Sequence, residues 1–144
     1  MHSSALLNLE NFFSVYLKNF HNPKILDFGS QSLSDHVGAK VLLNKINIKH
    51  EYTGVDIEKG NNVDIVLEDP YSFKEIPDAS YDVIISTSVF EHVEFFWLTY
   101  LEILRILKPN GVFYFNVPSN GDFHRWPQDC WRFYPDSGNA LINW

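Results

Sequence analysis

The sequence predicts an α/β fold: a doubly wound, mostly parallel sheet with helices on both faces. Two observations lead to this prediction. Short β-rich runs alternate along the chain with helical stretches, an order that gives parallel strands joined by right-handed crossovers. Two of these runs, 24–28 and 51–57, each present an aspartate near the carboxyl end, Asp27 in the first and Asp56 in the second.

The composition indicates one folded domain of 144 residues. Apolar residues make up 45% and charged residues 20%, as expected for a globular protein with a sizeable core. The net charge of -7 argues against nucleic acid or an anionic membrane as a partner, because binding phosphates needs clustered Lys and Arg. Cys130 is the only cysteine, which excludes an internal disulfide and a cysteine-based zinc site. With no apolar window of about 18 residues and no recognisable signal peptide, we expect a cytoplasmic location.

The first helix is expected over residues 4–20, where apolar residues recur every three or four positions before Pro23. The run 24–28 follows as a buried strand that ends in a turn at Gly29. A second helix is expected over 35–46. Its start behind a glycine turn would offer free backbone N–H groups to an anionic ligand group.

The second strand is expected over 51–57 and a third, short strand over 64–67. The loop between them, 58–63, cannot hold a crossover helix. Six extended residues reach about 20 Å, which is just enough to return along a short strand. The third strand is therefore expected at the sheet edge, joined by a bare loop.

Three contiguous apolar residues, 83–85, predict that a strand over 81–87 is covered on both faces. The helix expected over 94–107 is apolar nearly all round, so it should be well buried. A Pro-Asn-Gly turn at 109–111 ends it, and a fifth strand follows over 112–117.

Asp27 and Asp56 are expected to lie close together, because the carboxyl ends of parallel strands meet at one edge of a sheet. Two carboxylates at strand ends, about thirty residues apart, favour a nucleoside-type cofactor lying across that edge. An aspartate at a strand end can also simply cap a turn, so neither residue decides the matter alone.

Five segments, in one order and spacing, resemble a known family. They are Ile25-Leu26-Asp27-Phe28-Gly29-Ser30, Gly54-Val55-Asp56-Ile57, Tyr81-Asp82-Val83-Ile84-Ile85, Phe90-Glu91-His92-Val93 and Leu104-Arg105-Ile106-Leu107-Lys108-Pro109-Asn110-Gly111. Together they resemble the class I S-adenosylmethionine-dependent methyltransferases, of the methyltransferase domain 11 type found among small-molecule and sugar methyltransferases. The resemblance covers the chain from about residue 23 to its C-terminus. It implies a Rossmann-like fold and an enzyme that uses S-adenosyl-L-methionine.

The resemblance also implies a role for each matching position. Gly29 would let the backbone approach the methionine part of the cofactor, and Asp27 would face the cofactor's amino group. Asp56 would accept hydrogen bonds from both ribose hydroxyls. Asp69 aligns with the family position that reads the adenine amino group. The full cofactor-binding set implied in this way is Asp27, Gly29, Ser30, Asp56, Ile57, Asp69, Pro70 and Ser86.

The chain departs from the family pattern in three places. The first turn reads Gly29-Ser30-Gln31 where the family usually has Gly-x-Gly, although the amides of residues 30–32 can still face a ligand. No helix fits between the second and third strands. Related enzymes usually add a further helix and two antiparallel strands beyond the position of Trp144. The predicted sheet is therefore C-terminally shortened, and its fifth strand exposes an edge that a second copy of the chain, in a homodimer, could cover.

The aromatic-rich segment 118–135 follows the end of a strand, next to the expected position of the reactive methyl group, and we interpret it as a substrate lid. His124 is the candidate general base for a hydroxyl acceptor, since the free pKa of histidine lies near working pH. His92 is a second candidate. Asp129 could orient His124, and Arg132 could hold an acceptor carboxylate or phosphate. The remaining residues of the expected acceptor-binding set are Arg125 and Trp131.

A purely structural interpretation of this segment stays open. Asp129 and Arg132 are three residues apart and could form an ion pair, with the aromatic residues of the segment packed in the core. The spacing of His92, His124 and Asp129 carries no metal-ligand signature, so we expect no metal site.

The chain thus divides into an N-terminal helix (1–22), a cofactor-binding core (23–118) and a lid (119–144), all within one domain. We expect a methyltransferase acting on a small-molecule or saccharide acceptor at a hydroxyl oxygen; the sequence leaves the acceptor and the choice between O- and N-methylation open. A catalytically silent, methyltransferase-like binding domain is the main alternative. A nicotinamide-dependent oxidoreductase is disfavoured because Gly-x-Gly-x-x-Gly is missing, and nucleic-acid methylation is disfavoured because no base-flipping signature is present.

Overall fold

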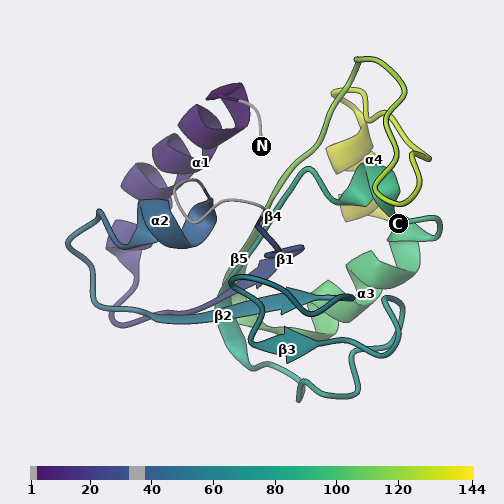
Figure 1. The fold of residues 1–144 in the computed structure, drawn as a ribbon. Coiled ribbons are helices and arrows are strands. Elements are labelled where there is room, and N and C mark those ends of the chain that lie inside the picture. Colours follow the sequence, from purple (N-terminus) through teal and green to yellow (C-terminus); the bar gives the residue numbers. More distant parts are fainter. Residues whose placement is uncertain (1–2, 33–37) are drawn as a thin grey trace.

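A five-stranded sheet, in which every neighbouring pair of strands is parallel, forms the centre of the described part of the chain (Figure 1). The structure is a computed structural model that describes residues 3–32 and 38–144. The strand order is β3-β2-β1-β4-β5. The strands are β1 (Lys24–Phe28), β2 (Glu51–Asp56), β3 (Ile65–Val66), β4 (Tyr81–Thr87) and β5 (Leu107–Asn116). The predicted α/β class is confirmed, and the parallel pairing extends to both edges.

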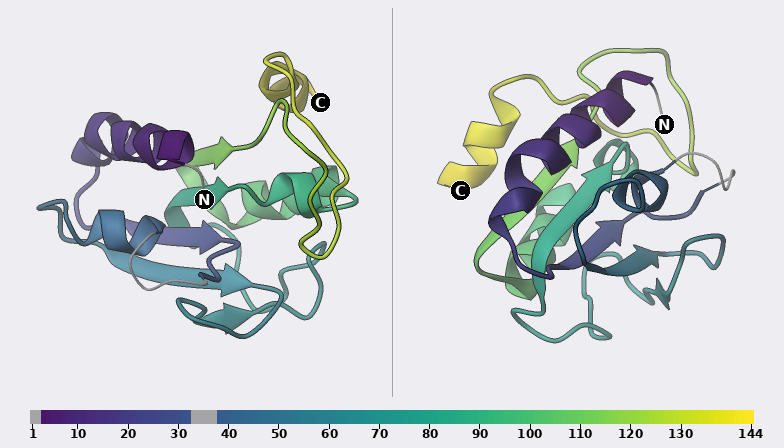
Figure 2. Two further views of the ribbon diagram at one scale, coloured as in Figure 1. Left: turned by 45° about the horizontal axis from the view of Figure 1, so that its top comes forward. Right: turned by 90° about the vertical axis from the view of Figure 1, so that its left-hand side faces the viewer.

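Helices cover both faces of the sheet, as a doubly wound fold requires. Figures 1 and 2 show α1 and α2 on one face and α3 on the other. The helical elements are α1 (Ser3–Tyr16), η1 (Leu17–Asn19), α2 (Ala39–Leu43), η2 (Phe90–His92), α3 (Phe96–Ile106) and α4 (Ser137–Asn143), where η marks a 3₁₀ turn. None of the described helices is long and apolar enough to span a membrane.

Strand β4 separates two apolar cores because its successive side chains point to opposite faces. Val83 and Ile85 pack with Phe13 of α1 on one side. Ile84 packs with Ile103 of α3 on the other side. Burying each such aliphatic side chain is worth about 1.5–3 kcal/mol, which explains why a contiguous apolar run forms the central strand.

The connection between β2 and β3 is a bare loop, and β3 is an edge strand, as predicted. The loop lies tightly against β2 at Gly54, where an added Cβ would come within 1.7 Å of the Asn62 carbonyl oxygen. The Asp64 amide donates to the Gly54 carbonyl, and the Gly54 amide donates to Oδ2 of Asp64, each at 2.8 Å. Only glycine at position 54 leaves room for this short return.

Two expectations for the second half of the chain are wrong. Helix α3 is not buried all round, since Leu98, Leu101 and Leu104 are 39–46% exposed along its outer side. The helix rests on the sheet along one side only, with Tyr100 and Ile103 inward, and nothing in the described residues covers the other side. Strand β5 begins at Leu107, earlier than expected, with its pairing to β4 shifted between Tyr81 and Val83.

The ends of other elements also differ from the expectations. The N-terminal helix changes to a 3₁₀ turn after Tyr16. The described helix α2 spans only Ala39–Leu43, and the expected helix start at residues 35–37 lies outside the described residues. Helix α4 was not expected, and its Leu141 packs against the same core as α3.

Candidate functional site

Asp27 lies near the carboxyl end of β1 and is buried, with 7% of its surface exposed. Its Oδ2 accepts a 2.8 Å hydrogen bond from the Tyr52 hydroxyl on the neighbouring strand. Burial raises the pKa of Asp27 to about 7; the Tyr52 hydrogen bond opposes this rise, and the charge of Asp56 adds to it. A carboxyl in this state gains strongly from a cation placed beside it. The sequence indicated Asp27 but gave no sign of Tyr52 as its partner.

Asp56 ends β2, and backbone amides fix its carboxylate from two sides. Oδ2 accepts from the Gln31 amide at 3.0 Å, and Oδ1 accepts from the Ile57 amide at 2.8 Å. Oδ1 also accepts a longer hydrogen bond, 3.4 Å, from the Glu58 amide. A carboxylate has about four lone-pair sites, so Oδ2 can still accept from a ligand hydroxyl, and a second ligand hydroxyl could replace the long Glu58 contact on Oδ1. The hydrogen bond from Gln31 to Asp56 thereby holds the first turn against the end of β2, at the carboxyl ends of the strands.

The first turn is tighter than the sequence suggested. Gly29 has a φ of +79°, and a Cβ there would lie 2.2 Å from Cγ2 of Val89, so glycine is needed on both counts. The amides of Gly29 and Ser30 both donate to the Val55 carbonyl, and the Ser30 hydroxyl donates to the Asn62 carbonyl. The amides of residues 31 and 32 also have partners within the chain. The expected free amides at this turn are therefore engaged in holding the turn itself.

The end of β4 supplies two buried hydroxyls with no hydrogen-bond partner among the described residues, Ser86 Oγ and Thr87 Oγ1. Ser86 is paired in register with Phe28 of β1, beside the turn that starts at Gly29, and the next residue, Thr87, faces the other side of the strand. Buried hydroxyls normally find partners, so each of these two hydroxyls at the carboxyl end of β4 indicates a place for a polar ligand. The sequence indicated Ser86 and missed Thr87.

Three residues of the implied cofactor-binding set, Ile57, Asp69 and Pro70, follow β2 and β3. Ile57 is 45% exposed, next to Asp56. The Asp69 side chain caps its own loop by accepting from the Tyr71 amide at 2.8 Å, and the Pro70 carbonyl accepts from Thr99 of α3. The apolar side chain of Ile57 is thus available to a ligand, while the loop at 69–71 is fixed by its own hydrogen bonds.

The C-terminal segment (residues 118–135) docks on the turn η2 through a set of backbone hydrogen bonds. The amides of Cys130 and Trp131 both donate to the Glu91 carbonyl, at 2.7 and 3.1 Å. Nε2 of Gln128 donates to the His92 carbonyl at 3.1 Å, and the Gln128 carbonyl lies 2.5 Å from Nδ1 of His92. These contacts bring His124 and His92, 32 residues apart in the sequence, to a ring separation of 5.0 Å.

Asp129 and Arg132 form the ion pair that the structural interpretation described. The guanidinium contacts both carboxylate oxygens, at 2.5 and 2.7 Å, and Oδ2 also accepts from the His124 amide at 2.8 Å. The hydrogen bonds from Arg132 and then from His124 hold the pKa of Asp129 well below its usual range. Asp129 therefore orients the loop that carries His124, and Arg132 already has a carboxylate partner within the chain. Arg125 lies over the ring of the exposed Phe123, away from this pair.

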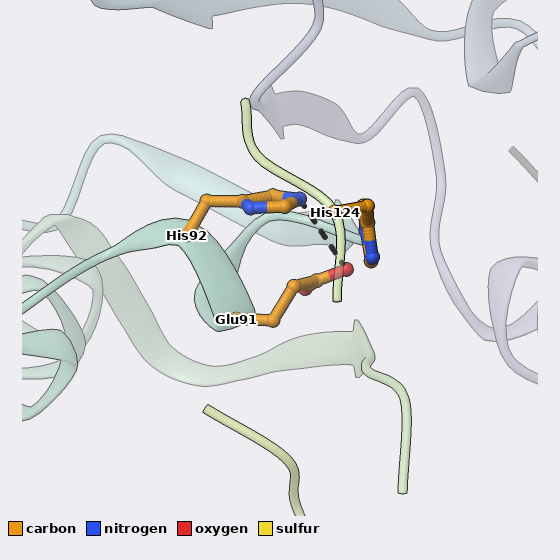
Figure 3. A group of neighbouring side chains, drawn as sticks. All are labelled: Glu91, His92 and His124. Carbon is orange, nitrogen blue, oxygen red and sulfur yellow. Dashed lines mark ion pairs between the residues drawn. The ribbon is translucent and has the colours of Figure 1, made fainter. Parts of the chain in front are cut away.

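Figure 3 shows the side chains of Glu91, His92 and His124 pointing toward one another. Glu91 is 1% exposed, and its Oε1 lies 3.8 Å from Nε2 of His92. Burial raises the pKa of Glu91 above its ordinary value, against the opposing effect of the two histidines and Arg132. The sequence singled out both histidines and Asp129, whose Oδ2 lies 3.7 Å from Nδ1 of His124, but it did not indicate Glu91 as a further acidic neighbour. The position of Glu91 directly before His92 was the sequence signal that could have indicated this role for Glu91.

Neither of two cavities in the described part of the chain is lined by Asp27 or Asp56. One of about 290 Å³ lies at the amino ends of the strands, lined by residues that include Lys24, Glu51 and Tyr81. Another, of about 360 Å³, lies between the end of β5 and helix α4, lined by residues that include Asn116 and Tyr134. We place the candidate site by its carboxylates and orphaned hydroxyls, because these are the groups that a polar ligand would satisfy.

The sequence profile of the family described as a methyltransferase domain matches residues 36–115, which is more than half of the chain. The chain belongs to this methyltransferase family. Members of this family use S-adenosyl-L-methionine. No curated protein sequence matches the chain.

Solved structures with the same fold include three that align over most of the chain. A candidate S-adenosyl-L-methionine-dependent methyltransferase from Methanococcus maripaludis is 20% identical, with a TM-score of 0.61, and the match covers 78% of this chain and 55% of that one. The YcgJ protein from Bacillus subtilis is 18% identical, with a TM-score of 0.71 over 99% of this chain and 67% of that one. The methyltransferase (CMeT) domain of the citrinin polyketide synthase is 18% identical, with a TM-score of 0.66 over 83% of this chain and 36% of that one.

At these identities the structural matches establish the fold, which is the methyltransferase fold predicted from the sequence. The chain spans about half the length of the Methanococcus maripaludis protein. Its own acceptor and chemistry therefore have to be argued from its own residues.

Proposed function

We propose that this protein is an S-adenosyl-L-methionine-dependent methyltransferase. The observation that carries the proposal is the pair of strand-end carboxylates: buried Asp27 and amide-fixed Asp56, at one sheet edge in a chain of the methyltransferase family. An ammonium group beside Asp27 would compensate the cost of burying its charge. Two ribose hydroxyls could donate to the remaining lone pairs of Asp56.

The residues present fit the cofactor. The orphaned hydroxyls of Ser86 and Thr87 lie at the end of β4, where the methionine part would be held, and Ile57 offers an apolar surface for the adenine. When bound, the cofactor supplies an activated methyl group on a positively charged sulfur. The protein has to align an acceptor with that methyl group and exclude water.

Calorimetric titration of the purified chain with S-adenosylhomocysteine tests this proposal. One-to-one binding at micromolar affinity or tighter is expected. A folded sample that binds none would remove the methyltransferase proposal for this chain and would favour the silent binding domain.

We propose a small-molecule or saccharide acceptor. In its favour, the net charge of -7 disfavours polyanions, and the C-terminal segment carries several exposed aromatic rings next to the expected methyl position. Phe123, Trp126 and Tyr134 are 59–71% exposed, and flat aromatic faces suit the apolar faces of sugar rings. A screen of sugar and small alcohol acceptors with labelled cofactor would measure transfer directly.

A hydroxyl acceptor would need a base, and His124 is the candidate. Nδ1 of His124 lies 3.1 Å from the Asp122 carbonyl, which can only accept, so Nδ1 carries a proton and the neutral form of the ring has its lone pair on Nε2. The side chain is 54% exposed and so can be reached by an acceptor. His124→Gln should slow methyl transfer without changing the affinity for S-adenosylhomocysteine.

The catalytically silent binding domain remains the second candidate function. The tight first turn favours it, because the amides of Gly29 and Ser30 that could approach a ligand already have partners. The fold alone does not decide, since the [4+2]-cyclase SpnF has the same fold, with a TM-score of 0.67 and 16% identity. The titration above separates the two functions.

We also propose that β5 pairs with a second copy of the chain. Strand β5 is a sheet edge among the described residues, and its residues 111–116 are only half-buried. An unpaired edge invites another strand. Light scattering coupled to size-exclusion chromatography should give the mass of a dimer, and a monomer at all concentrations would remove this proposal.

A further inference from the structure

Glu91, His92 and His124 form a compact three-residue cluster (Figure 3). One ligand atom from each residue can be chosen so that all three lie within 4.8 Å of one another. The cluster joins two separate parts of the chain, since Glu91 and His92 belong to η2 and His124 belongs to the C-terminal segment. Its members converge from two directions, as ligands around an ion do.

For both imidazole rings, the contact at Nδ1 selects the neutral tautomer whose Nε2 can bind a metal ion. His92 has Nδ1 at 2.5 Å from the Gln128 carbonyl, and His124 has Nδ1 at 3.1 Å from the Asp122 carbonyl. A carbonyl only accepts, so each Nδ1 carries the proton and each Nε2 of the neutral ring carries a lone pair. A backbone carbonyl on the second ring nitrogen is the usual outer support of a metal-binding histidine.

Glu91 supplies an independent indication of a cation-binding site. Its side chain is 1% exposed, and its Oε2 has no hydrogen-bond partner among the described residues. Its one ion-pair contact in the described part of the chain is the 3.8 Å approach of Oε1 to Nε2 of His92, which counts only if that ring is charged. A buried carboxylate with one oxygen left without a partner is costly, and buried charges are normally paired or bind metals.

We propose that Glu91, His92 and His124 bind one divalent transition-metal ion, with Zn²⁺ as the first candidate. Two imidazoles and a carboxylate are a ligand set that suits such ions, and three protein ligands leave a fourth position open, as in catalytic zinc sites. Zinc–ligand distances of about 2.0–2.2 Å require ligand atoms about 3.4 Å apart. The cluster would therefore contract slightly, and the exposed side chain of His124 can make that movement.

The site has a consequence for the acceptor that rests on the proposed function. A bound divalent ion lowers the pKa of a hydroxyl at its open position, which is the activation that an alcohol acceptor needs. His124 cannot be a ligand and a general base at once, because both roles use the lone pair of Nε2. The acceptor class consistent with the site is therefore an alcohol that reaches the open position.

Calorimetric titration of the full, tag-free chain with Zn²⁺ alone tests the site. One-to-one binding at micromolar affinity or tighter is expected. Glu91→Gln and His124→Gln should each weaken binding at least tenfold. His50→Gln is the matched control, because Nδ1 of His50 also contacts a backbone carbonyl, that of Ile48, outside any cluster of this kind, and Zn²⁺ affinity should stay unchanged.

Absence of Zn²⁺ binding, or binding that His124→Gln leaves intact, would overturn the proposal. His124 is exposed, so its variant should fold even where the buried Glu91→Gln does not. A parallel titration with S-adenosylhomocysteine keeps the two proposals apart. Cofactor binding without Zn²⁺ binding removes only the metal site, whereas Zn²⁺ binding that depends on His124 without cofactor binding removes only the methyltransferase function.

Discussion

The Tyr52 hydroxyl donates a 2.8 Å hydrogen bond to Oδ2 of Asp27, so β2 holds in place the buried acid of β1. Tyr52 pairs in register with Ile25, which puts it on the same sheet face as Asp27, one step back along the strand. The bond matters because it lowers a pKa that burial has raised. Asp27 is consequently balanced between its neutral and charged forms near neutral pH, where a ligand ammonium group would decide the state.

Tyr52→Phe should weaken cofactor binding through Asp27. Losing the hydrogen bond raises the pKa of Asp27 above about 7, so fewer molecules carry the charge at pH 7.5. A hydrogen bond to a charged group is worth about 1.5–3 kcal/mol, so we expect the affinity for S-adenosylhomocysteine to fall about tenfold or more. Calorimetry at pH 7.5 and 9 measures it, and the loss should shrink at pH 9. Tyr16→Phe, on the half-exposed side of α1, should have no effect.

Asp27 also predicts how stability depends on pH. Its folded pKa of about 7 lies above the unfolded value of 3.8, so the folded state binds the proton more tightly. The contribution of Asp27 to the free energy of unfolding is fully present below about pH 4. It is lost as pH rises through about 7, and the loss is roughly 4 kcal/mol at most. Asp27→Asn should remove this slope. Urea unfolding between pH 4 and 8 measures it, and an equal slope in both proteins would contradict the assignment.

Asp56→Ala should weaken S-adenosylhomocysteine binding by about 1–3 kcal/mol, because two ribose hydroxyls lose their acceptor. The exposed neighbour Glu58→Ala is the control and should bind normally. Calorimetric affinities of the two variants give the comparison. Unchanged affinity in Asp56→Ala would remove this residue from the cofactor site and leave it only its role of holding the Gln31 and Ile57 amides.

Asp129→Asn should loosen the C-terminal segment from η2. The ion pair with Arg132 lowers the pKa of Asp129, so the charged carboxylate favours the folded arrangement. The contribution of this ion pair to stability is lost only as pH falls well below 4. We expect the variant at pH 7 to be cut faster by protease within residues 118–135 than the natural protein is. Asp122→Asn tests specificity, since only the backbone carbonyl of Asp122 contacts Arg132. Equal cleavage of all three proteins would show that the pair does not hold the segment.

Several features of the fold and site followed from the sequence because they depend on local patterns. A contiguous apolar run predicted β4. The distance that six extended residues can span predicted the bare loop before β3. The contact of Tyr52 with Asp27 needed the register of β1 on β2, which no local pattern encodes. The partner of Arg132 was undecided because the same guanidinium could bind Asp129 or an acceptor, and only the folded segment brings Asp129 within reach.

The role of Glu91 was hidden for a similar reason. Spacing along the chain could not show that the C-terminal segment returns to η2 and sets His124 beside an acid 33 positions earlier in the sequence. The hydrogen bonds from residues 130 and 131 to the Glu91 carbonyl create that neighbourhood. Sites assembled by a returning segment therefore become visible only once the fold is known.

Gly29→Ala should destabilise the fold for two separable reasons. A φ of +79° costs a residue with a Cβ about 1–2 kcal/mol, and the new methyl group would also lie 2.2 Å from Cγ2 of Val89. Urea unfolding should show a loss larger than the backbone cost alone. Adding Val89→Ala should recover the part due to crowding and leave the backbone part. Gly121→Ala is the matched control, because Gly121 also has a positive φ, +120°, with nothing within 4 Å of an added Cβ. If Val89→Ala recovers nothing beyond its own effect, the close approach of Val89 does not explain the need for glycine at the first turn.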